Sequence, residues 1–411
     1  MKRVVTVVVG AGQCGLAMSH ELCRRSIDHV VLERGKIASS WHAERWDSLR
    51  LLTPNWMNGV AGRPYDGPQP DGYMSATHFA NDLQRAATLN GAPVMTETQV
   101  LSLNQHGGGY SVQTDQGVIV CGSVVIATGE CAIPKVPRFA SELPANVVQL
   151  TPQSYKRPSG VPEGRVLVVG ASASGLQIAR ELNAAGRQVV LAVGNHLRMP
   201  RRYRGADILW WIHRTGDLDV PYSKVDDFDR LRRNPSLPLS GNAAMADIDL
   251  NSLQDLGIEV VGRLAAIRDG TAWFSGSLAN ACATADLKLN RLLDRIDALA
   301  EAKRIAAEPS YRLPATCVPD TPRLSLRTWE GGVRSVIWAT GYEPDHAWVN
   351  LPIFDGKARI RHVGGVVGDG LYVMGLKYLR TARSTHIAGA SRDARALARH
   401  LVSRPACRAA A

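Results

Sequence analysis

The cysteines of this 411-residue chain lack the spacing of a disulfide framework, a zinc ribbon or a redox dithiol. There are seven, an odd number, and no two of them form a C-x-x-C pair. They are Cys14, Cys23, Cys121, Cys131, Cys282, Cys317 and Cys407. The eleven histidines show no H-x-x-x-H or H-E-x-x-H arrangement either, so the sequence predicts no metal site.

Long apolar runs are also absent. No run approaches the roughly 18 apolar residues that a membrane span needs. The amino terminus reads M-K-R-V-V-T-V-V-V-G-A-G, which enters a glycine turn where a signal peptide would have a small-residue cleavage site. We therefore expect a soluble, cytoplasmic protein with no integral membrane association. At about 150 residues per domain, the length and the 45% hydrophobic content predict two or three globular domains.

Acidic residues are the minority, with 37 Asp and Glu against 48 Lys and Arg, for a net charge of +11. Taken alone, this balance favours a polyanionic partner such as nucleic acid or a membrane surface. The positive charge is concentrated in residues 156–233 and 376–411. In the second cluster, Arg392, Arg395 and Arg399 recur at helical spacing, which is typical of the solvated face of a C-terminal helix. The first cluster directly follows a nucleotide-binding pattern, so we expect no nucleic-acid partner.

Residues 4–33 contain the elements of one dinucleotide-binding unit. The β-branched run V-V-T-V-V-V precedes G-A-G-Q-C-G, a helical segment, and a second strand that ends at Glu33. Gly10 permits the tight turn, Gly12 lets the backbone approach a pyrophosphate, and Gly15 lets the helix pack close to the strand. The helix N-terminus supplies amide donors for phosphates, and Glu33 would accept hydrogen bonds from a ribose diol. A purely structural glycine turn is the alternative.

The unit repeats 160 residues later. The segment R-V-L-V-V-G-A-S-A-S-G-L-Q again predicts a strand, a turn and a helix. Gly170 and Gly175 take the outer turn positions, but Ser172 replaces the middle glycine. A small hydroxyl at this position can still donate to a phosphate.

The second strand of the repeated unit ends without an acid. It continues into G-N-H-L-R-M-P-R-R-Y-R, and its cations are Arg198, Arg201, Arg202 and Arg204. They lie where a 2′-phosphate would bind, so the sequence favours NADPH over NADH. The alternative is that these arginines form ion pairs with nearby acids. The nearest acids are Asp207, Asp217 and Asp219.

With these two turns, the chain resembles the two-dinucleotide-domain flavoproteins, and among them the FAD- and NADPH-dependent flavin-containing monooxygenases and their bacterial relatives. The resemblance spans nearly the whole chain. It also rests on S-S-W-H-A-E-R-W-D-S-L-R-L-L-T-P (39–54), V-V-I-A-T-G (124–129), V-I-W-A-T-G-Y (336–342) and G-L-Y-V-M-G (370–375). It implies an α/β fold of two Rossmann-like domains, with the NADPH domain inserted into a discontinuous FAD domain.

The resemblance also implies a set of residues that bind the cofactors. Trp41 and residues 48–53 are expected along the flavin, and the two A-T-G elements are expected to link the domains. Gly129 and Gly341 would turn the chain sharply where a flat cofactor leaves little room for Cβ. The expected cofactor-binding residues are Gly10, Gly12, Gln13, Cys14, Gly15, Glu33, Arg34, Trp41, Arg50, Leu51, Leu52, Thr53, Val100, Ala127, Thr128, Gly129, Gly170, Ser172, Ser174, Gly175, Arg198, Arg201, Arg202, Ala339, Thr340 and Gly341.

The implied activity is a monooxygenase. Hydride would pass from NADPH to FAD, O₂ would add as a peroxyflavin, and one oxygen atom would go to a small organic substrate. The sequence shows no catalytic triad or carboxylate pair, which fits chemistry carried by a flavin. The alternative is an oxidase or reductase without oxygen transfer, whereas a disulfide reductase is disfavoured because no dithiol exists. Two family features are missing: the F-x-G-x-x-x-H-x-x-x-[YFW] fingerprint keeps only Tyr155, and Leu376 follows Gly375 where many relatives have Asp.

The expected domain ranges are 1–157 and 331–411 for the FAD domain and 158–330 for the NADPH domain, with the linker K-R-P-S-G-V-P-E-G at 156–164. The breaker-rich loop 57–72 is expected on the substrate approach. An amphipathic helix over 278–301 should cover a hydrophobic surface, with a homodimer interface as the alternative. Trp210 and Trp211 are placed on a helix that Gly216 stops, and His386 is interpreted as structural.

Overall fold

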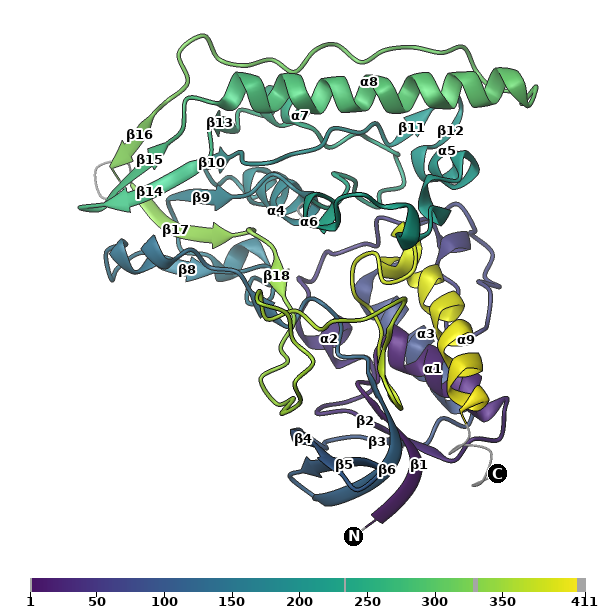
Figure 1. Ribbon diagram of the computed structural model, residues 1–411. Helices are drawn as coiled ribbons and strands as arrows, with labels where there is room; N and C mark the ends of the chain where they lie inside the picture. Colours follow the sequence, from purple (N-terminus) through teal and green to yellow (C-terminus); the bar gives the residue numbers. More distant parts are fainter. Residues whose placement is uncertain (1, 233, 328–331, 405–411) are drawn as a thin grey trace.

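Two β-sheets form the framework of the protein, and each carries one of the glycine turns. The computed structural model describes residues 2–232, 234–327 and 332–404. Figure 1 shows the sheet of the first turn at the lower end of the molecule and the sheet of the second turn at the upper end. The sequence prediction of an α/β fold with two Rossmann-like units is therefore confirmed.

The first sheet has the strand order β19-β20-β6-β1-β2-β3, with β4 and β5 continuing from β6. Its strands are β1 (Lys2–Val9), β2 (His29–Leu32), β3 (Val94–Met95), β4 (Val100–His106), β5 (Gly109–Thr114), β6 (Gly117–Ile126), β19 (Val366–Gly368) and β20 (Leu371–Val373). β1 runs parallel to both β2 and β6. Residues 6–9 of β1 are buried on both faces, which explains the β-branched run at this end of the strand.

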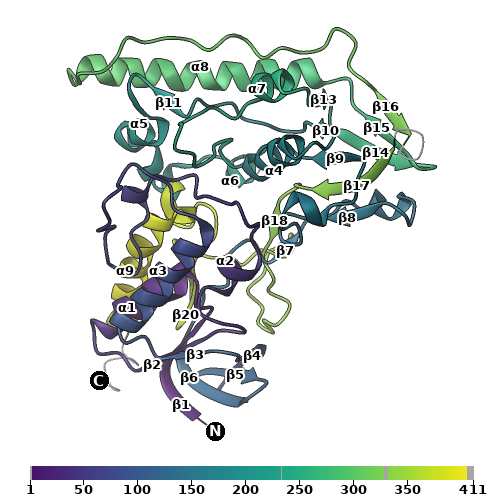
Figure 2. The same ribbon diagram turned by 180° about the vertical axis from the view of Figure 1, so that it is seen from behind.

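Three helices cover one face of the first sheet. They are α1 (Gln13–Cys23), α3 (Ala76–Leu89) and α9 (Ile387–Ser403), and Figures 1 and 2 show them side by side. A single apolar core joins them to the sheet, with Leu16 of α1, Leu83 of α3 and Leu397 of α9 packed together with Val8 and Val125. Helix α9 comes from the end of the chain, so this domain is assembled from both ends of the sequence.

The second sheet has the order β13-β10-β9-β17-β8, and every neighbouring pair is parallel. Its strands are β8 (Val148–Leu150), β9 (Arg165–Val169), β10 (Val189–Ala192), β13 (Glu259–Val261) and β17 (Val333–Trp338). The strands β8 and β17 lie outside the expected range 158–330, so the second sheet extends past both expected domain boundaries. The glycine- and proline-rich stretch at 156–164 connects two strands of this one sheet, β8 and β9.

Two helices of the second half behave as the sequence predicts. Helix α8 (Leu278–Ala302) buries the stripe of Leu289, Leu293 and Ile296. Helix α5 (Ile208–Thr215) ends at Gly216, which has a φ of +78°. The remaining elements are α2 (Ser39–Ala43), α4 (Ala173–Ala184), α6 (Phe228–Arg232), α7 (Leu250–Asp255), β7 (Ile133–Pro134), β11 (Arg202–Tyr203), β12 (Ala206–Asp207), β14 (Leu264–Arg268), β15 (Thr271–Phe274), β16 (Ser325–Arg327) and β18 (Tyr342–Glu343).

The C-terminal arginines lie on the outer face of α9, as the sequence predicts. Arg392 and Arg395 are at least half exposed, and each forms an ion pair, with Asp219 and Glu21 respectively. No helix among the described residues is long and apolar enough to cross a membrane. The six described cysteines are free, and Cys407 lies outside the described residues.

Candidate nucleotide sites and the domain interface

The first glycine turn has the close contacts that its sequence predicts. Gly10 has a φ of +103°, and a Cβ there would lie 2.8 Å from the carbonyl oxygen of Ala127. A Cβ on Gly15 would lie only 1.8 Å from the carbonyl oxygen of Gly10. Neither position can hold a side chain, because the helix and two strands meet at these atoms.

Gly12, unlike Gly10 and Gly15, is not in close contact with the protein. A Cβ at this residue would meet no protein atom within 4 Å, so the turn leaves open space in front of it. Helix α1 begins directly after Gly12 and has no side chain capping its N-terminus. Its first amides are therefore available to an anion, and the helix dipole favours a negative charge at this point. The turn fits the pyrophosphate of a dinucleotide.

Glu33 lies at the end of β2, beside the same turn. One carboxylate oxygen accepts a hydrogen bond of 2.8 Å from the amide of Ala11, and the other accepts one of 3.1 Å from the amide of Gly35. These bonds hold the carboxylate at the edge of the turn, where the ribose of a bound dinucleotide would lie. A carboxylate has lone pairs left over after two such bonds, so it can still accept from a ribose diol.

Several residues expected along the flavin gather next to this turn. The indole nitrogen of Trp41 donates to the side-chain oxygen of Gln13 at 3.2 Å. Leu51 belongs to the same apolar core as Ala11 and Cys14. Burial, with help from Asp393 and Glu130, raises the pKa of the Cys14 thiol to about 12, so this cysteine is a neutral packing residue.

Four other predicted residues lie further from the turn or are already partnered. Arg34 forms an exposed ion pair with Glu44, and Arg50 donates to the carbonyl oxygen of Tyr73. The hydroxyl of Thr53 donates to Asn58 at 2.5 Å. Val100 begins β4, where it pairs with Thr114 in the antiparallel part of the first sheet.

The second glycine turn repeats the first. Gly170 has a φ of +114°, and its Cβ would lie 2.3 Å from the carbonyl oxygen of Ala339. A Cβ on Gly175 would lie 1.8 Å from the carbonyl oxygen of Gly170. Helix α4 also starts without a side-chain cap, because neither Ser172 nor any neighbour closes its N-terminus. This turn fits a second dinucleotide, with the hydroxyls of Ser172 and Ser174 nearby.

The two A-T-G elements have a role that the sequence did not reveal. The carbonyl oxygens of Ala127 and Ala339 lie under the first glycine of the two turns, and thereby force glycine at both places. Gly129 and Gly341 have positive φ angles of 77° and 95°, and a Cβ on either would meet no protein atom within 4 Å. Within the protein, backbone conformation alone accounts for these two glycines. The hydroxyl of Thr128 is buried without a partner among the described residues, and Thr340 donates to the carbonyl oxygen of Lys135.

The arginines expected at a 2′-phosphate form ion pairs within the protein. Arg198 is 4% exposed and binds Asp249 and Asp286, and Arg201 is 1% exposed and binds Asp207. A phosphate could reach them only by breaking buried ion pairs, which is costly. Arg201 therefore pairs with one of the nearby acids that the sequence offered as the alternative, whereas the partners of Arg198 lie much further along the chain. Arg202 and Arg204 are more accessible, but they pair with Glu308 and Asp297.

Arg263 is the cation that sequence reasoning missed. It is exposed, and it follows β13, the strand parallel to β10. Its guanidinium donates to the side chain of Asn195 at 2.8 Å, three residues beyond the end of β10. Carboxyl ends of parallel strands share one edge of a sheet, so Arg263 and Asn195 lie together at that edge. The parallel strand order could have pointed to it.

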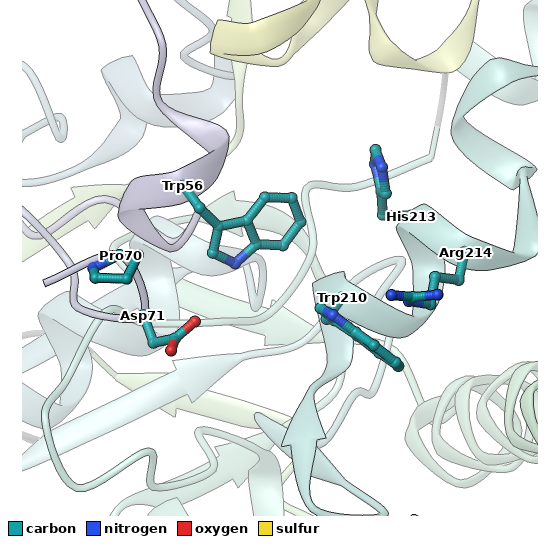
Figure 3. Close-up of a pocket in the computed structure, with 6 residues that line it drawn as sticks. All are labelled: Trp56, Pro70, Asp71, Trp210, His213 and Arg214. Carbon is teal, nitrogen blue, oxygen red and sulfur yellow. The ribbon is translucent and has the colours of Figure 1, made fainter. Parts of the chain in front are cut away.

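A pocket lies between the two halves of the molecule. It has a volume of about 620 Å³ and is lined by Trp56, Pro70, Asp71, Trp210, His213 and Arg214. Figure 3 shows Trp56 on a short 3-10 helix (Asn55–Met57), Pro70 and Asp71 on the loop beside it, and the last three residues on α5 opposite. Pro70 and Asp71 belong to the loop 57–72, which is predicted on the substrate approach. Trp211 packs in the core, while Trp210 faces the pocket with Arg214 stacked on its ring at 4.0 Å.

The neutral ring of His213 is held in one tautomer by a neighbouring arginine. Its Nδ1 lies 3.0 Å from the guanidinium of Arg383, which is 5% exposed and bound to Asp219. A guanidinium has only donors, so Nδ1 must accept and the proton of the neutral ring lies on Nε2. Burial and the charge of Arg383 lower the pKa of His213. The pocket therefore contains a neutral imidazole with a fixed N–H donor.

Comparisons with known proteins agree with this geometry. A family model described as pyridine nucleotide-disulphide oxidoreductase matches residues 7–210. An uncharacterized oxidoreductase, CzcO-like, of Geobacillus kaustophilus is 29% identical over 399 residues, which cover 96% of this chain and 97% of the relative. A probable indole-3-pyruvate monooxygenase, YUCCA4 of Arabidopsis thaliana, is 30% identical over 235 residues, 56% of this chain and 57% of the relative. The solved structure of a flavin-containing monooxygenase from Stenotrophomonas maltophilia has the same fold, with a TM-score of 0.67 and 17% identity over 98% of this chain and 99% of that one.

Two glycine turns with free helix N-termini and the matched family model define the class. The protein is an FAD-dependent oxidoreductase with two dinucleotide-binding domains that uses NAD(P)H. Within this class, the chain is similar to flavin-containing monooxygenases.

Proposed function

We propose that this protein uses NADPH to reduce bound FAD and transfers one atom of O₂ to a small organic substrate. The flavin supplies the redox chemistry and, through a peroxyflavin, the oxygen atom. One observation carries the proposal: the two turns are built alike, but an acid, Glu33, borders the first and a cation, Arg263, lies at the edge of the second sheet, hydrogen-bonded to the neutral Asn195. An acid suits a ribose diol, and a cation suits a 2′-phosphate.

The protein's own residues would bind and orient the two cofactors. The amides at the start of α1 hold the FAD pyrophosphate, with Glu33 on the adenosine ribose. The amides at the start of α4 hold the second pyrophosphate, with Ser172 as a further donor. Arg263 and Asn195 take the 2′-phosphate of NADPH, because they stand at the joint carboxyl edge of β10 and β13.

The pocket between the loop 55–71 and α5 is the proposed approach for the substrate. Two indole rings, Trp56 and Trp210, offer flat apolar surfaces, and His213 offers its N–H donor. A planar molecule with a carbonyl or carboxylate oxygen suits these groups. The relatives named indole-3-pyruvate monooxygenases act on such a molecule, so indole-3-pyruvate belongs in the first substrate panel.

Rapid mixing of the NADPH-reduced protein with oxygen tests the proposal. We expect an oxygenated flavin absorbance that persists long enough to be resolved and that decays faster when a substrate is present. Immediate reoxidation with stoichiometric hydrogen peroxide, unchanged by any substrate in the panel, would instead support the oxidase or reductase alternative.

A further inference from the structure

Arg201 is a charged side chain in an unusually buried place. It is 1% exposed and lies in the segment that follows β10 of the second sheet. A buried charge is costly unless ion pairs and hydrogen bonds satisfy it, and an apolar residue of similar volume would often stabilise the fold more. The contacts of Arg201 therefore indicate what the charge is needed for.

Those contacts cross to the first domain. Arg201 donates a hydrogen bond of 2.7 Å to the carbonyl oxygen of Leu52, and its guanidinium lies 4.7 Å from the centre of the Tyr73 ring. It forms an ion pair with Asp207, and the hydroxyl of Tyr73 donates to the same carboxylate at 2.6 Å. Arg201, Tyr73 and Asp207 thus form one closed set of contacts, which we call the Arg201 clamp.

The clamp acts on the segment next to the first glycine turn. Leu51 packs in one core with Ala11 and Cys14 of that turn, and its amide donates to the carbonyl oxygen of Met74 at 2.9 Å. Gly241, from the second half, approaches so closely that a Cβ there would lie 2.2 Å from the carbonyl oxygen of Leu51. The second half therefore contacts two successive carbonyls, those of Leu51 and Leu52.

The clamp also fixes the wall of the pocket. One oxygen of Asp207 accepts from Arg201 and Tyr73, and the other accepts from the amide of Leu209 at 2.8 Å and caps α5. Helix α5 carries Trp210, so the same carboxylate sets where this side chain enters the pocket.

We infer that Arg201 is a positioning residue for hydride transfer, which holds the flavin-facing segment Leu51–Thr53 in register with the NADPH-binding half. This inference rests on the proposed function for the identity of the two nucleotides. Arg201 itself is not expected to contact NADPH. A displacement of about 1 Å between the reacting atoms can cost about 100-fold in rate, so a loosened clamp should slow the reduction of the flavin.

The test measures the reduction of the bound flavin, without oxygen, after rapid mixing with NADPH or with NADH. In this experiment the KM is the nucleotide concentration that gives half of the maximal rate constant. Arg201→Lys keeps the charge, but an ammonium cannot satisfy Leu52 and Asp207 and also stack on Tyr73. We expect the rate constant for reduction to fall about 10-fold or more with both nucleotides, and the KM for each to change less than about 2-fold. The visible circular dichroism of bound FAD should change as well.

Two further variants make the result decisive. Tyr73→Phe keeps the ring and removes only the bond to Asp207, so it should give a smaller loss of the same kind even if Arg201→Lys does not fold. Arg323→Lys is the matched control, because Arg323 pairs with Glu259 at 2.6 Å on the surface of the same half, and it should leave reduction unchanged.

Wild-type reduction rates in Arg201→Lys and Tyr73→Phe would overturn the inference, as would a rise in KM confined to NADPH. The measurement excludes oxygen, so a protein that fails to transfer oxygen to any substrate would still show the effect.

Discussion

The guanidinium of Arg263 donates a hydrogen bond to Asn195 across two parallel strands, at the edge where both strands end. Both side chains carry further N–H groups that could donate to a phosphate. Arg263→Ala should therefore raise the KM for NADPH about 10- to 100-fold, as loss of a hydrogen bond to a charged group predicts. The KM for NADH should remain within about 2-fold, because NADH lacks the phosphate.

Steady-state reduction of an artificial electron acceptor provides this measurement. Arg323→Ala, on the same half of the molecule, is the control and should discriminate between the nucleotides as the wild type does. Equal effects of Arg263→Ala on both nucleotides would remove Arg263 from the phosphate site.

The two kinds of glycine in the first turn should respond differently to a side chain. At Gly12 a side chain has room within the protein but enters the space assigned to the pyrophosphate. Gly12→Val should therefore fold, keep the melting temperature of the apoprotein, and lose most of its FAD during purification. Gly15→Val is the contrasting variant, because its Cβ would lie 1.8 Å from a carbonyl oxygen, and it should fail to fold. Full FAD content in Gly12→Val would place the cofactor elsewhere.

The protonation state of His213 should depend on Arg383. Burial is the main cause of its lowered pKa, and the charge of Arg383 is the next. Arg383→Met removes that charge and leaves Asp219 behind, so the pKa of His213 should rise. An NMR titration of the histidine ring measures it, with Arg395→Met as a control that removes a cation from the outer face of the same domain. An unchanged pKa would show that Arg383 does not govern the ring.

Buried histidines should make the fold sensitive to acid. Burial lowers the pKa values of His196, His362 and His386 from 6.5 to about 4. Between these values the unfolded chain binds more protons than the folded one, so the free energy of unfolding should fall as the pH drops from 6.5 towards 4. Asp393 acts in the opposite direction, because burial raises its pKa to about 6. Burial also raises the pKa values of Glu130, Glu181 and Asp247, and it lowers those of His20, His29, His213 and His346. Among the described residues, these seven histidines outnumber the four carboxyl groups.

Urea unfolding at pH 7.5 and at pH 5 tests this prediction. His196 is the best position for a variant, because it is 5% exposed and neither ring nitrogen has a partner among the described residues. His196→Leu should reduce the loss of stability on acidification. His78→Leu, at an exposed histidine, should not. Equal pH dependence of both variants would mean that burial of His196 does not contribute.

The sequence predicts local structure well in this protein because local structure depends on near neighbours. Glycine spacing and strand periodicity identify both turns, and Gly216 marks the end of α5. Contacts between distant residues could not be predicted in this way. Arg198 binds carboxylates 51 and 88 residues away, and Arg263 meets Asn195 at a separation of 68. No spacing pattern shows such pairs, since only the order of strands in the folded sheet brings them together.

The carboxylate of Asp207 takes part in three separate contacts although it is partly exposed. It neutralises Arg201, accepts the hydroxyl of Tyr73 and caps α5. Any replacement disturbs the charge balance, the domain contact and the pocket wall in one step, and no single compensating change can restore all three. Evolution should therefore exchange Asp207 only together with Arg201 and Tyr73, and these three positions should covary among relatives while the exposed ion pairs around them drift independently.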